Sequence, residues 1–337
     1  MRRQSKEHIV NFLGTSSRSW LCAIALLLSA FMPAVAQDAS QRRIAVLASS
    51  SADKELWNAF LKGMQELGWT EGRNLLVDWR SAEGDYAKLP GLARELVARN
   101  PEVLVTATTP GVTAARSATS TIPIVMATIG DPVGAGFVKS LSNPGGNVTG
   151  VSNVEQDVSE KLIEFLTAMS RKTTSVAILH NPANPSHKGT SDRVAAAAKR
   201  AGISSIHIPA ENLTAIQNGL ASARKRGATG LIVLSDSIFR LHAEQISRLA
   251  IQSRMPSACF NRELTASGCL LSYGPSFSRN FHRSASYVDR ILKGAHPATL
   301  PVELSNEFDL VINRRTARTL ALALPPEILV RATGIID

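Results

Sequence analysis

The chain has 337 residues, of which 44% are hydrophobic, 5% aromatic and 19% charged, and its formal net charge is +10. This composition excludes a wholly disordered chain, a collagen-like repeat and a small scaffold held together by disulfides. At roughly 100–200 residues per domain, the length predicts two domains, each large enough to bury a core.

The first 36 residues have the pattern of a secretory signal peptide. Arg2, Arg3 and Lys6 precede an apolar run at 20–32, and Ala34-Val35-Ala36 follows it. A basic region, a short apolar stretch and small residues at such a site predict cleavage after Ala36 and release into the periplasm. An uncleaved N-terminal anchor is the alternative, and the export route stays open.

The basic excess does not indicate nucleic-acid binding. Removing the first 36 residues takes away four basic residues and one acidic residue, which leaves a net charge of +7 spread along the chain. An exported chain without a basic arm or alternating basic and aromatic residues is not typical of nucleic-acid-binding proteins. We therefore expect these charges to lie on a solvated surface.

From residue 41 onward, short apolar runs alternate with amphipathic segments. The first strands are expected at 44–47, 74–79, 103–106 and 122–126, with helices at 56–67 and 89–97 between them. Later helices are expected at 162–169, 191–201, 214–226, 242–253 and 281–292. Continuously apolar strands separated by amphipathic helices predict an α/β fold with parallel sheets covered on both faces.

The same α/β unit is predicted to occur twice. The strand at 44–47 is echoed at 176–179, the strand at 103–106 at 231–234, and Ile122-Pro123 by Met255-Pro256, at a nearly constant offset. We expect two doubly wound lobes, the first comprising 37–152 plus 274–302 and the second 153–273 plus 303–337. Several crossing segments would join them around a ligand cleft.

Catalytic, metal and cofactor motifs are absent from the sequence. Neither G-x-S-x-G, H-E-x-x-H, the P-loop pattern nor C-x-x-C occurs. Gly134-Ala135-Gly136 begins like a dinucleotide fingerprint, but Lys139 stands where the third glycine belongs. We expect no cofactor, no metal and no catalytic residue. Cys259 and Cys269 either form a disulfide or stay as two buried thiols.

Small polar residues follow most of the predicted strands. They are Ser49 and Ser50, Thr108 and Thr109, Asp131, Asn181 and Asp236. The carboxyl ends of the strands face the ligand crevice in open α/β sheets. Hydroxyls there suit a carboxylate and aspartates suit an ammonium, although the same residue types also cap helices.

Six segments together resemble the substrate-binding proteins of ABC transporters, a family that includes tryptophan and aromatic amino-acid-binding proteins. They lie at 67–85, 121–153, 230–237, 270–274, 287–303 and 308–322, and GDPVGAGFVKSL followed by PGGNVTG is the most characteristic. The resemblance implies a type I periplasmic-binding-protein (Venus-flytrap) fold with three crossings. It also implies a monomer that hands a small ligand, such as an amino acid, to a membrane permease and its ATPase.

The resemblance also suggests a ligand pocket. Its residues would be Ser49, Ser50, Thr108, Thr109, Asp131, Ser152, Asn181, Asp236, Phe260 and Tyr273, with the last two as the aromatic contributors. The chain departs from the aromatic amino-acid binders at 49–54 and 259–263, so the identity of the ligand stays open.

The alternative functions are those of a sensory protein, an exported enzyme and a lac-repressor-type regulator. A sensory protein that presents its loaded form to a membrane receptor fits the same sequence features. An exported enzyme would need Cys259 or His180 as a catalytic residue, and nothing in the sequence activates either one. A lac-repressor-type regulator would need an N-terminal helix-turn-helix where the predicted signal peptide lies.

Overall fold

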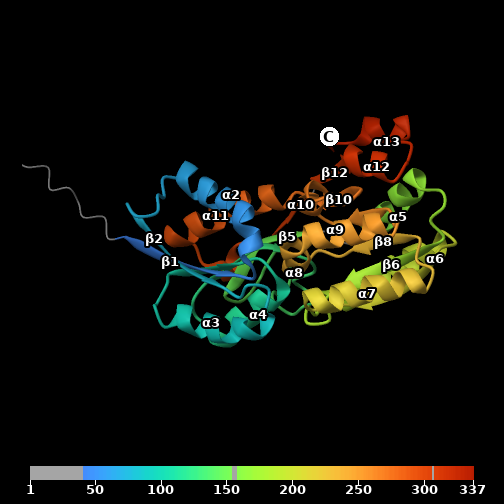
Figure 1. The fold of residues 1–337 in the computed structure, drawn as a ribbon. Coiled ribbons are helices and arrows are strands. Elements are labelled where there is room, and N and C mark those ends of the chain that lie inside the picture. The colour runs from blue at the N-terminus through green and yellow to red at the C-terminus, as the bar shows by residue number, and fades with distance from the viewer. Residues whose placement is uncertain (1–40, 154–157, 306) are drawn as a thin grey trace, which may run out of the picture. The chain divides into compact units, whose positions relative to one another are not determined.

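The computed structural model describes residues 41–153, 158–305 and 307–337. The predicted signal peptide, 1–36, lies outside these residues. The described chain forms two sheets, each covered by helices on both faces (Figure 1). The predicted α/β class with two doubly wound lobes is confirmed.

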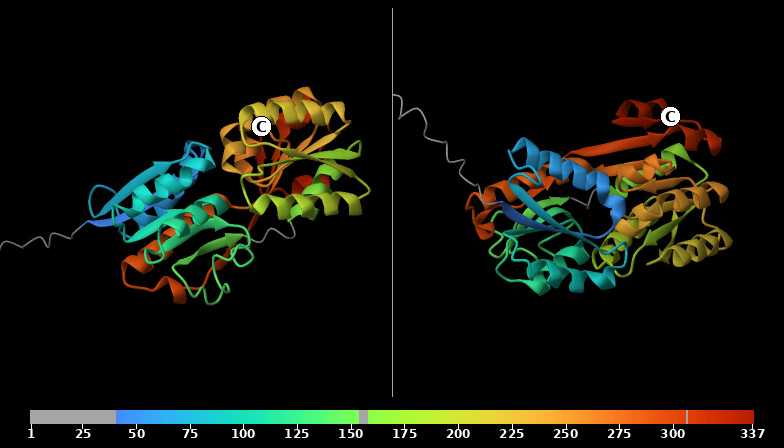
Figure 2. Two further views of the ribbon diagram at one scale, coloured as in Figure 1. Left: turned by 90° about the horizontal axis from the view of Figure 1, so that it is seen from below. Right: turned by 60° about the vertical axis from the view of Figure 1, so that its left-hand side comes forward.

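The first sheet has six parallel strands in the order β11-β5-β4-β3-β1-β2. Their bounds are β1 Arg42–Ala48, β2 Leu75–Ser81, β3 Val103–Thr106, β4 Ile124–Ile129, β5 Val148–Asn153 and β11 Glu303–Ser305. Alternate residues of β1 enter two separate cores. Ile44 and Val46 pack with α2 (Lys54–Glu66) and α11 (Phe277–Leu292), whereas Ala45 and Leu47 pack with α3 (Leu89–Val97) and α4 (Thr109–Ala118). Figure 2 shows the helices and the sheets from two further directions.

The second sheet has seven strands in the order β13-β12-β10-β9-β8-β6-β7, and only the β10–β12 pair is antiparallel. The strands are β6 Ser175–His180, β7 Ser204–Pro209, β8 Gly230–Val233, β9 Ser257–Cys259, β10 Leu271–Pro275, β12 Phe308–Asn313 and β13 Gly334–Ile336. The helices are α5 Val158–Met169, α6 Ser186–Arg200, α7 Leu213–Lys225, α8 Ser237–Leu241, α9 Ala243–Gln252, α10 Arg262–Ala266, α12 Arg314–Thr319 and α13 Pro326–Arg331. Helices α5 and α6 share one core with Val176 and Ile178, while α7 and α9 share the other with Ala177 and Leu179.

The described strands and helices change from one sheet to the other three times along the chain. The passages follow β5, β10 and β11, because α5 and β12 belong to the second sheet and α11 to the first. Helix α11 packs closely on α2, and a Cβ at Gly63 would lie 2.6 Å from the carbonyl oxygen of His282. This close packing requires glycine at position 63.

Strand pairing corrects two of the predicted lobe boundaries by a few residues. The second lobe was predicted to resume at residue 303, but Glu303–Ser305 pair with β5 and extend the first sheet. Similarly, Gly274 and Pro275 pair with β12 in the second sheet, although 274 was predicted to begin the return to the first lobe. In both places the turn lies beyond the strand end, and apolar patterning alone does not locate it.

The glycine that ends the PGGNVTG segment allows two strands to approach closely. Gly150 in β5 has φ +133°, and a Cβ there would lie 2.2 Å from the carbonyl oxygen of Met126 in β4. A side chain at this position would force the two strands apart. The segment therefore ends in glycine for a structural reason.

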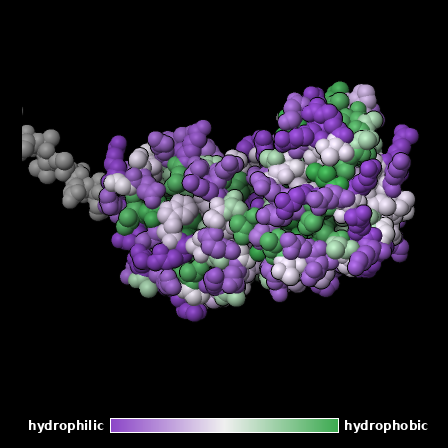
Figure 3. Space-filling view, viewed as in Figure 1, coloured by the Kyte–Doolittle hydropathy of each residue, from purple (hydrophilic) through white to green (hydrophobic). Residues whose placement is uncertain are grey.

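Polar side chains cover most of the face shown in Figure 3, with smaller apolar groups between them. Among the described residues, the exposed large hydrophobic side chains belong to several separate elements: Leu67, Val133, Leu304, Val330 and Ile335. No helix in this part of the chain is both long enough and apolar enough to cross a membrane.

Cys259 and Cys269 form a disulfide, which decides between the two alternatives left by their spacing. The bond joins the end of β9 to the turn before β10, ten residues later in the chain. Both cysteines are buried. The disulfide therefore closes a short loop inside the second lobe.

Reducing this disulfide is expected to lower stability by about 3 kcal/mol, since the closed loop restricts the unfolded chain. At roughly 2–4 °C per kcal/mol, the melting temperature should fall by roughly 6–12 °C. Thermal unfolding followed by circular dichroism, with and without dithiothreitol, measures the change. A Cys259→Ala/Cys269→Ala variant is the control, because its melting temperature should not respond to the reductant. An equal melting temperature in the reduced and oxidised native protein would contradict the prediction.

Candidate ligand site between the two sheets

A cavity of about 50 Å³ is lined by residues from both lobes. They come from the carboxyl ends of β4 and β5, from the loops after β3, β4, β6 and β8, and from helices α4, α6, α8 and α11. The lining residues are Ala107, Thr108, Thr109, Thr128, Ile129, Gly130, Asn153, Asn184, Ser186, Ser235, Asp236, Ser237, Arg240, Phe277 and Phe281. Carboxyl ends of parallel strands thus meet around one polar space, as expected for an open α/β sheet.

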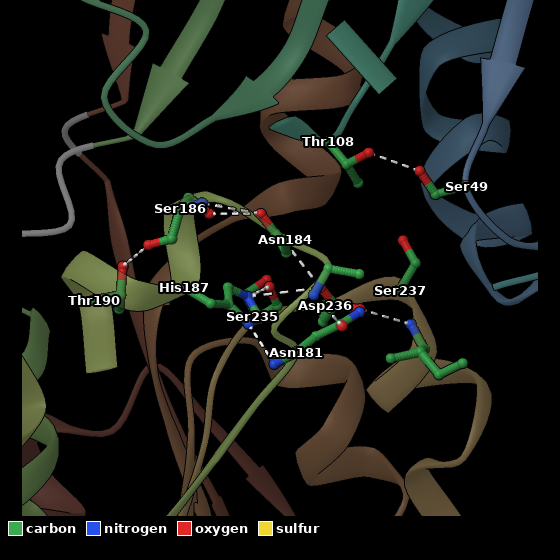
Figure 4. Close-up of polar contacts among 12 residues, drawn as sticks. Ser49, Thr108, Asn181, Asn184, Ser186, His187, Thr190, Ser235, Asp236 and Ser237 are labelled. Carbon is green, nitrogen blue, oxygen red and sulfur yellow. Dashed lines mark hydrogen bonds and ion pairs between the residues drawn. The ribbon is translucent and has the colours of Figure 1, made fainter. Parts of the chain in front are cut away.

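On the first-lobe side, two hydroxyls lie together. The Ser49 and Thr108 oxygens are 2.7 Å apart, and either can donate to the other (Figure 4). Thr108 is also the N-cap of α4 and accepts from the Gly111 N–H at 3.2 Å. Hydroxyls beside the first turn of a helix are good donors for an anionic group.

On the second-lobe side, Asp236 is the carboxylate that lines the cavity among the residues that the structure describes. Its Oδ1 accepts from the Tyr86 hydroxyl at 2.9 Å, the Asn181 amide at 3.2 Å and the Ile238 N–H at 3.1 Å. Its Oδ2 accepts one bond, from the Asn184 amide at 3.0 Å (Figure 4). Because a carboxylate oxygen has about two lone-pair positions, Oδ2 keeps capacity to accept from a ligand.

His187 fixes the two loops that carry this polar corner. Its Nδ1 accepts from the Asn181 backbone N–H at 2.8 Å, so the neutral ring carries its hydrogen on Nε2. Nε2 then donates to the Ser235 carbonyl oxygen at 3.0 Å and lies 3.6 Å from Asp236 Oδ2. The buried ring thereby ties the loop after β6 to the loop after β8.

A buried ion pair crosses between the lobes beside the cavity. Arg240 Nε and Nη2 donate to Asp53 Oδ1 at 2.8 and 2.6 Å, and the Ser237 hydroxyl donates to Asp53 Oδ2 at 3.0 Å. Asp53 lies in the first lobe, in the short segment between β1 and α2. Arg240 and Ser237 belong to α8 of the second lobe. Only 1% of the Asp53 side chain and 7% of the Arg240 side chain are exposed.

The model of the family described as ABC transporter substrate binding protein matches residues 42–336 of this chain. The chain belongs to this family. It is similar to the tyrosine-binding protein of Clostridioides difficile (strain R20291), with 24% identity over 261 residues, 77% of this chain and 75% of that protein.

Two solved structures share the fold over the whole of their chains. One is the ABC domain from Streptococcus pneumonia in complex with L-Trp, with 25% identity and a TM-score of 0.82. The other is a conserved domain protein from Vibrio cholerae, with 30% identity and a TM-score of 0.83. Each match covers 88% of this chain and 100% of the other. The family is one of solute-binding proteins rather than an enzyme class.

Five of the predicted site residues come together in this substrate-binding protein. Ser49 and Thr108 form the hydroxyl pair, and Thr109 lines the cavity beside them. Asp236 lines the opposite side of the cavity. Asn181 does not line the cavity itself, but its side-chain amide donates to Asp236. We keep these five as the proposed ligand-site residues.

The other five lie elsewhere. Ser50 caps the short helix η1 (Ser51–Asp53) by accepting from the Ala52 N–H at 3.1 Å, and lines a separate first-lobe pocket. Exposed Asp131, at φ +31°, accepts from the Gly134 N–H at 2.7 Å. Ser152 is buried within β5 and donates to the Ile129 carbonyl oxygen at 3.0 Å. All three satisfy nearby backbone groups.

The two predicted aromatic contributors belong to the core of the second lobe. Phe260 is buried there, and Tyr273 packs between Phe165 and Phe308 at ring distances of 5.3 and 5.7 Å. Neither residue lines the cavity. In this structure, aromatic groups near the cavity come instead from α11, as Phe277 and Phe281.

Sequence reasoning missed several of the polar residues around the cavity. Ser235 and Ser237 flank Asp236, and Thr128 precedes the Gly130-Asp131 strand end, so their positions carried a usable signal. The sequence carried no such signal for Asn280, because its partners are far away in the chain. From α11, its side-chain amide donates to Thr128 at 3.3 Å and to Asn153 at 2.7 Å. Among the described residues, no group of three or more His, Cys, Asp or Glu side chains could hold a metal ion.

The bond between Tyr86 and Asp236 predicts a loss of stability in alkali. Burial and the Asp236 carboxylate raise the pKa of Tyr86 well above the usual value of about 10. The folded protein therefore keeps a proton that the unfolded chain loses above about pH 10, and its stability falls as the pH rises further. This loss should approach about 1.4 kcal/mol per pH unit.

Tyr86→Phe removes this ionisation and should show a smaller loss between pH 9 and 11, measured by urea unfolding. The pKa of Tyr287 is also raised, by burial and by Glu303, but that residue is unchanged in both proteins. Equal losses in the native protein and the variant would contradict the prediction.

Proposed function

We propose that this substrate-binding protein captures an L-amino acid between its two lobes in the periplasm and delivers it to an ABC permease. The observation that carries the proposal is the polar cavity with hydroxyls on one side and the Asp236 carboxylate on the other. An α-amino acid carries a carboxylate and an ammonium, which match these two sides.

The carboxylate would bind Ser49, Thr108 and Thr109 at the start of α4. Hydroxyls and first-turn amide groups suit an anion, and the helix dipole favours negative charge there. The ammonium would bind Asp236 Oδ2, through a charge-assisted hydrogen bond. Because Asn181 and Asn184 hold Asp236 in place, its carboxylate is oriented before the ligand arrives.

Two relatives support an amino acid as the ligand. The Clostridioides difficile relative is a tyrosine-binding protein, and the Streptococcus pneumonia domain contains L-Trp. The segment at 259–263, where the sequence departs from the aromatic amino-acid binders, does not line the cavity. Aromatic amino acids therefore belong in any ligand screen, together with smaller ones.

Delivery would depend on movement of the lobes about the three passages between the sheets. A ligand that contacts both lobes favours the form in which they lie together, and the permease would recognise that form. We propose a monomer released by cleavage after Ala36, with the permease and its ATPase as partners.

A thermal-shift screen of the unfolded and refolded protein tests this function. Refolding removes any ligand carried over from expression. The panel contains the twenty L-amino acids, small carboxylates, nucleosides and sugars, each also tested against Asp236→Ala. A ligand at 100 times its Kd should stabilise the protein by about 2.7 kcal/mol. We expect shifts with L-amino acids that disappear in the variant, whereas shifts only with sugars or nucleosides would overturn the proposal.

A further inference from the structure

Three buried polar side chains of the first lobe form a hydrogen-bonded group beside the candidate site. Asn153 ends β5, Thr128 lies in β4, and Asn280 lies in the first turn of α11. The Asn280 side-chain amide donates to Asn153 Oδ1 at 2.7 Å and to the Thr128 hydroxyl at 3.3 Å. The Thr128 hydroxyl in turn donates to Asn153 Oδ1 at 2.9 Å. Of the three residues, Asn153 and Thr128 line the cavity.

These bonds determine which end of the Asn153 amide is free to meet a ligand. A carbonyl oxygen accepts about two hydrogen bonds, so Asn280 and Thr128 use Oδ1 fully. Nδ2 carries two N–H groups and has no hydrogen-bond partner among the residues that the structure describes, yet it is not fully buried. Because Asn153 is only 7% exposed and lines the cavity, these two N–H groups open onto that space.

The hydroxyls that the first lobe presents to the cavity leave few other hydrogens for a ligand. The Thr128 hydrogen is used in the bond to Asn153. Ser49 and Thr108 bond to each other, so only one of their two hydrogens stays available. Thr109 lines the cavity close to this pair, at the start of α4. The two N–H groups of Asn153 are therefore a large share of the donors on this side.

We propose that Asn153 Nδ2 donates to the carboxylate of the bound amino acid. The proposal rests on the amino-acid-binding function and adds a residue that orients the ligand, since the donors gather in the first lobe and the acceptor Asp236 lies in the second. Strands β3, β4 and β5 are neighbours in the sheet, so Thr109 and Asn153 adjoin the same carboxyl edge. Asn280 and Thr128 are positioning residues, because they hold Oδ1 and leave Nδ2 to the ligand.

This arrangement makes a specific demand on the ligand. A carboxylate oxygen accepts from a fixed N–H group, whereas the nitrogen of a carboxamide is itself a donor, and two donors that face each other both lose a hydrogen bond. Asn153 therefore selects amino acids with a free carboxylate over their primary amides.

Asn153→Asp replaces the donor with an acceptor at almost unchanged shape. The new carboxylate can still accept from Asn280 and Thr128, so the fold should be kept. Asn143→Asp is the matched control, because it makes the same change at an exposed position of the first lobe. Circular dichroism establishes that each variant folds. Isothermal titration then gives the Kd of the L-amino acid that stabilises the refolded native protein most, and the Kd of its primary amide, such as L-tyrosine and L-tyrosinamide.

The readout is the Kd of the amide divided by the Kd of the acid. We expect this ratio to be at least about 10 in the native protein, to fall at least about tenfold in Asn153→Asp, and to stay within about threefold of the native value in Asn143→Asp. A general loss of structure would weaken the binding of acid and amide alike and leave the ratio unchanged. An unchanged ratio in Asn153→Asp, or equal binding of acid and amide by the native protein, would overturn the role of Asn153.

Asn280→Asp provides a second test should Asn153→Asp not fold. A carboxylate at position 280 cannot donate to Asn153 Oδ1 but can accept from Nδ2, which would turn the Asn153 oxygen toward the cavity. The ratio should then fall at least about threefold, and an unchanged ratio would overturn the proposed orientation. A refolded native protein that binds no amino acid would instead overturn the proposed function, so the two failures are distinguishable.

Discussion

Replacing Asp236 by alanine is expected to weaken amino-acid binding by at least about 30-fold. Removing one partner of a buried, hydrogen-bonded charge pair costs about 2–5 kcal/mol, and each 1.4 kcal/mol is a factor of ten. Asp236 is 2% exposed and also organises Tyr86, Asn181 and Asn184, so the substitution removes both the ammonium acceptor and its surroundings. Isothermal titration measures the loss.

Asp192→Ala is the control for this experiment. Asp192 also lies in the second lobe, on α6, but it is exposed and pairs with Lys188, four residues before it on the same helix. A surface pair of this kind contributes about 0–1 kcal/mol, so binding should not change. If Asp236→Ala bound its amino acid as tightly as Asp192→Ala does, the assigned role of Asp236 would be wrong.

Replacing Arg240 by methionine should drive the two lobes apart. The substitution leaves the Asp53 carboxylate buried without its partner, and such a loss costs on the order of 3–5 kcal/mol. Parting of the lobes exposes Asp53 to water and relieves this cost. The radius of gyration from small-angle X-ray scattering should therefore rise, and ligand affinity should fall because the lobe-contact form becomes rare.

A double substitution tests whether the unpaired charge of Asp53 is what drives the lobes apart. Asp53→Asn/Arg240→Met removes both charges and should recover most of the lost affinity, since neither remaining side chain carries a buried charge. Arg283→Met is the control, because Arg283 on α11 and its partner Glu303 on β11 both belong to the first lobe and the pair is exposed. A radius of gyration in Arg240→Met equal to that of the control would contradict the role of the ion pair.

The fold was largely predictable from the sequence because its strands are continuously apolar. The runs at 44–47, 103–106 and 176–179 all lie in buried parallel strands, and the repeat of the α/β unit appears as two sheets. The position of a residue after a strand also placed Ser49, Thr108 and Asp236 around one cavity. Strand ends converge in space, so this neighbourhood follows from topology alone.

The direction of each side chain was not predictable in the same way. Ser50 follows Ser49 directly, yet its hydroxyl caps the next helix instead of joining Thr108. Contacts that cross between the lobes leave no local pattern, because their partners are far apart in the chain. Examples are the bond from Tyr86 to Asp236 and the pairing of Asp53 with Arg240. Phe260 and Tyr273 lie in the core, since aromatic residues near strand ends also fill space between helices and sheet.

Binding of an amino acid between the lobes at Asp236 is tested most directly by isothermal titration of the refolded protein. The titrant is the amino acid that gives the largest thermal shift, and native protein is compared with Asp236→Ala. We expect one site per chain in the native protein and at least about 30-fold weaker binding in the variant. Equal affinity in both proteins, or no amino acid bound by the native protein, would contradict it.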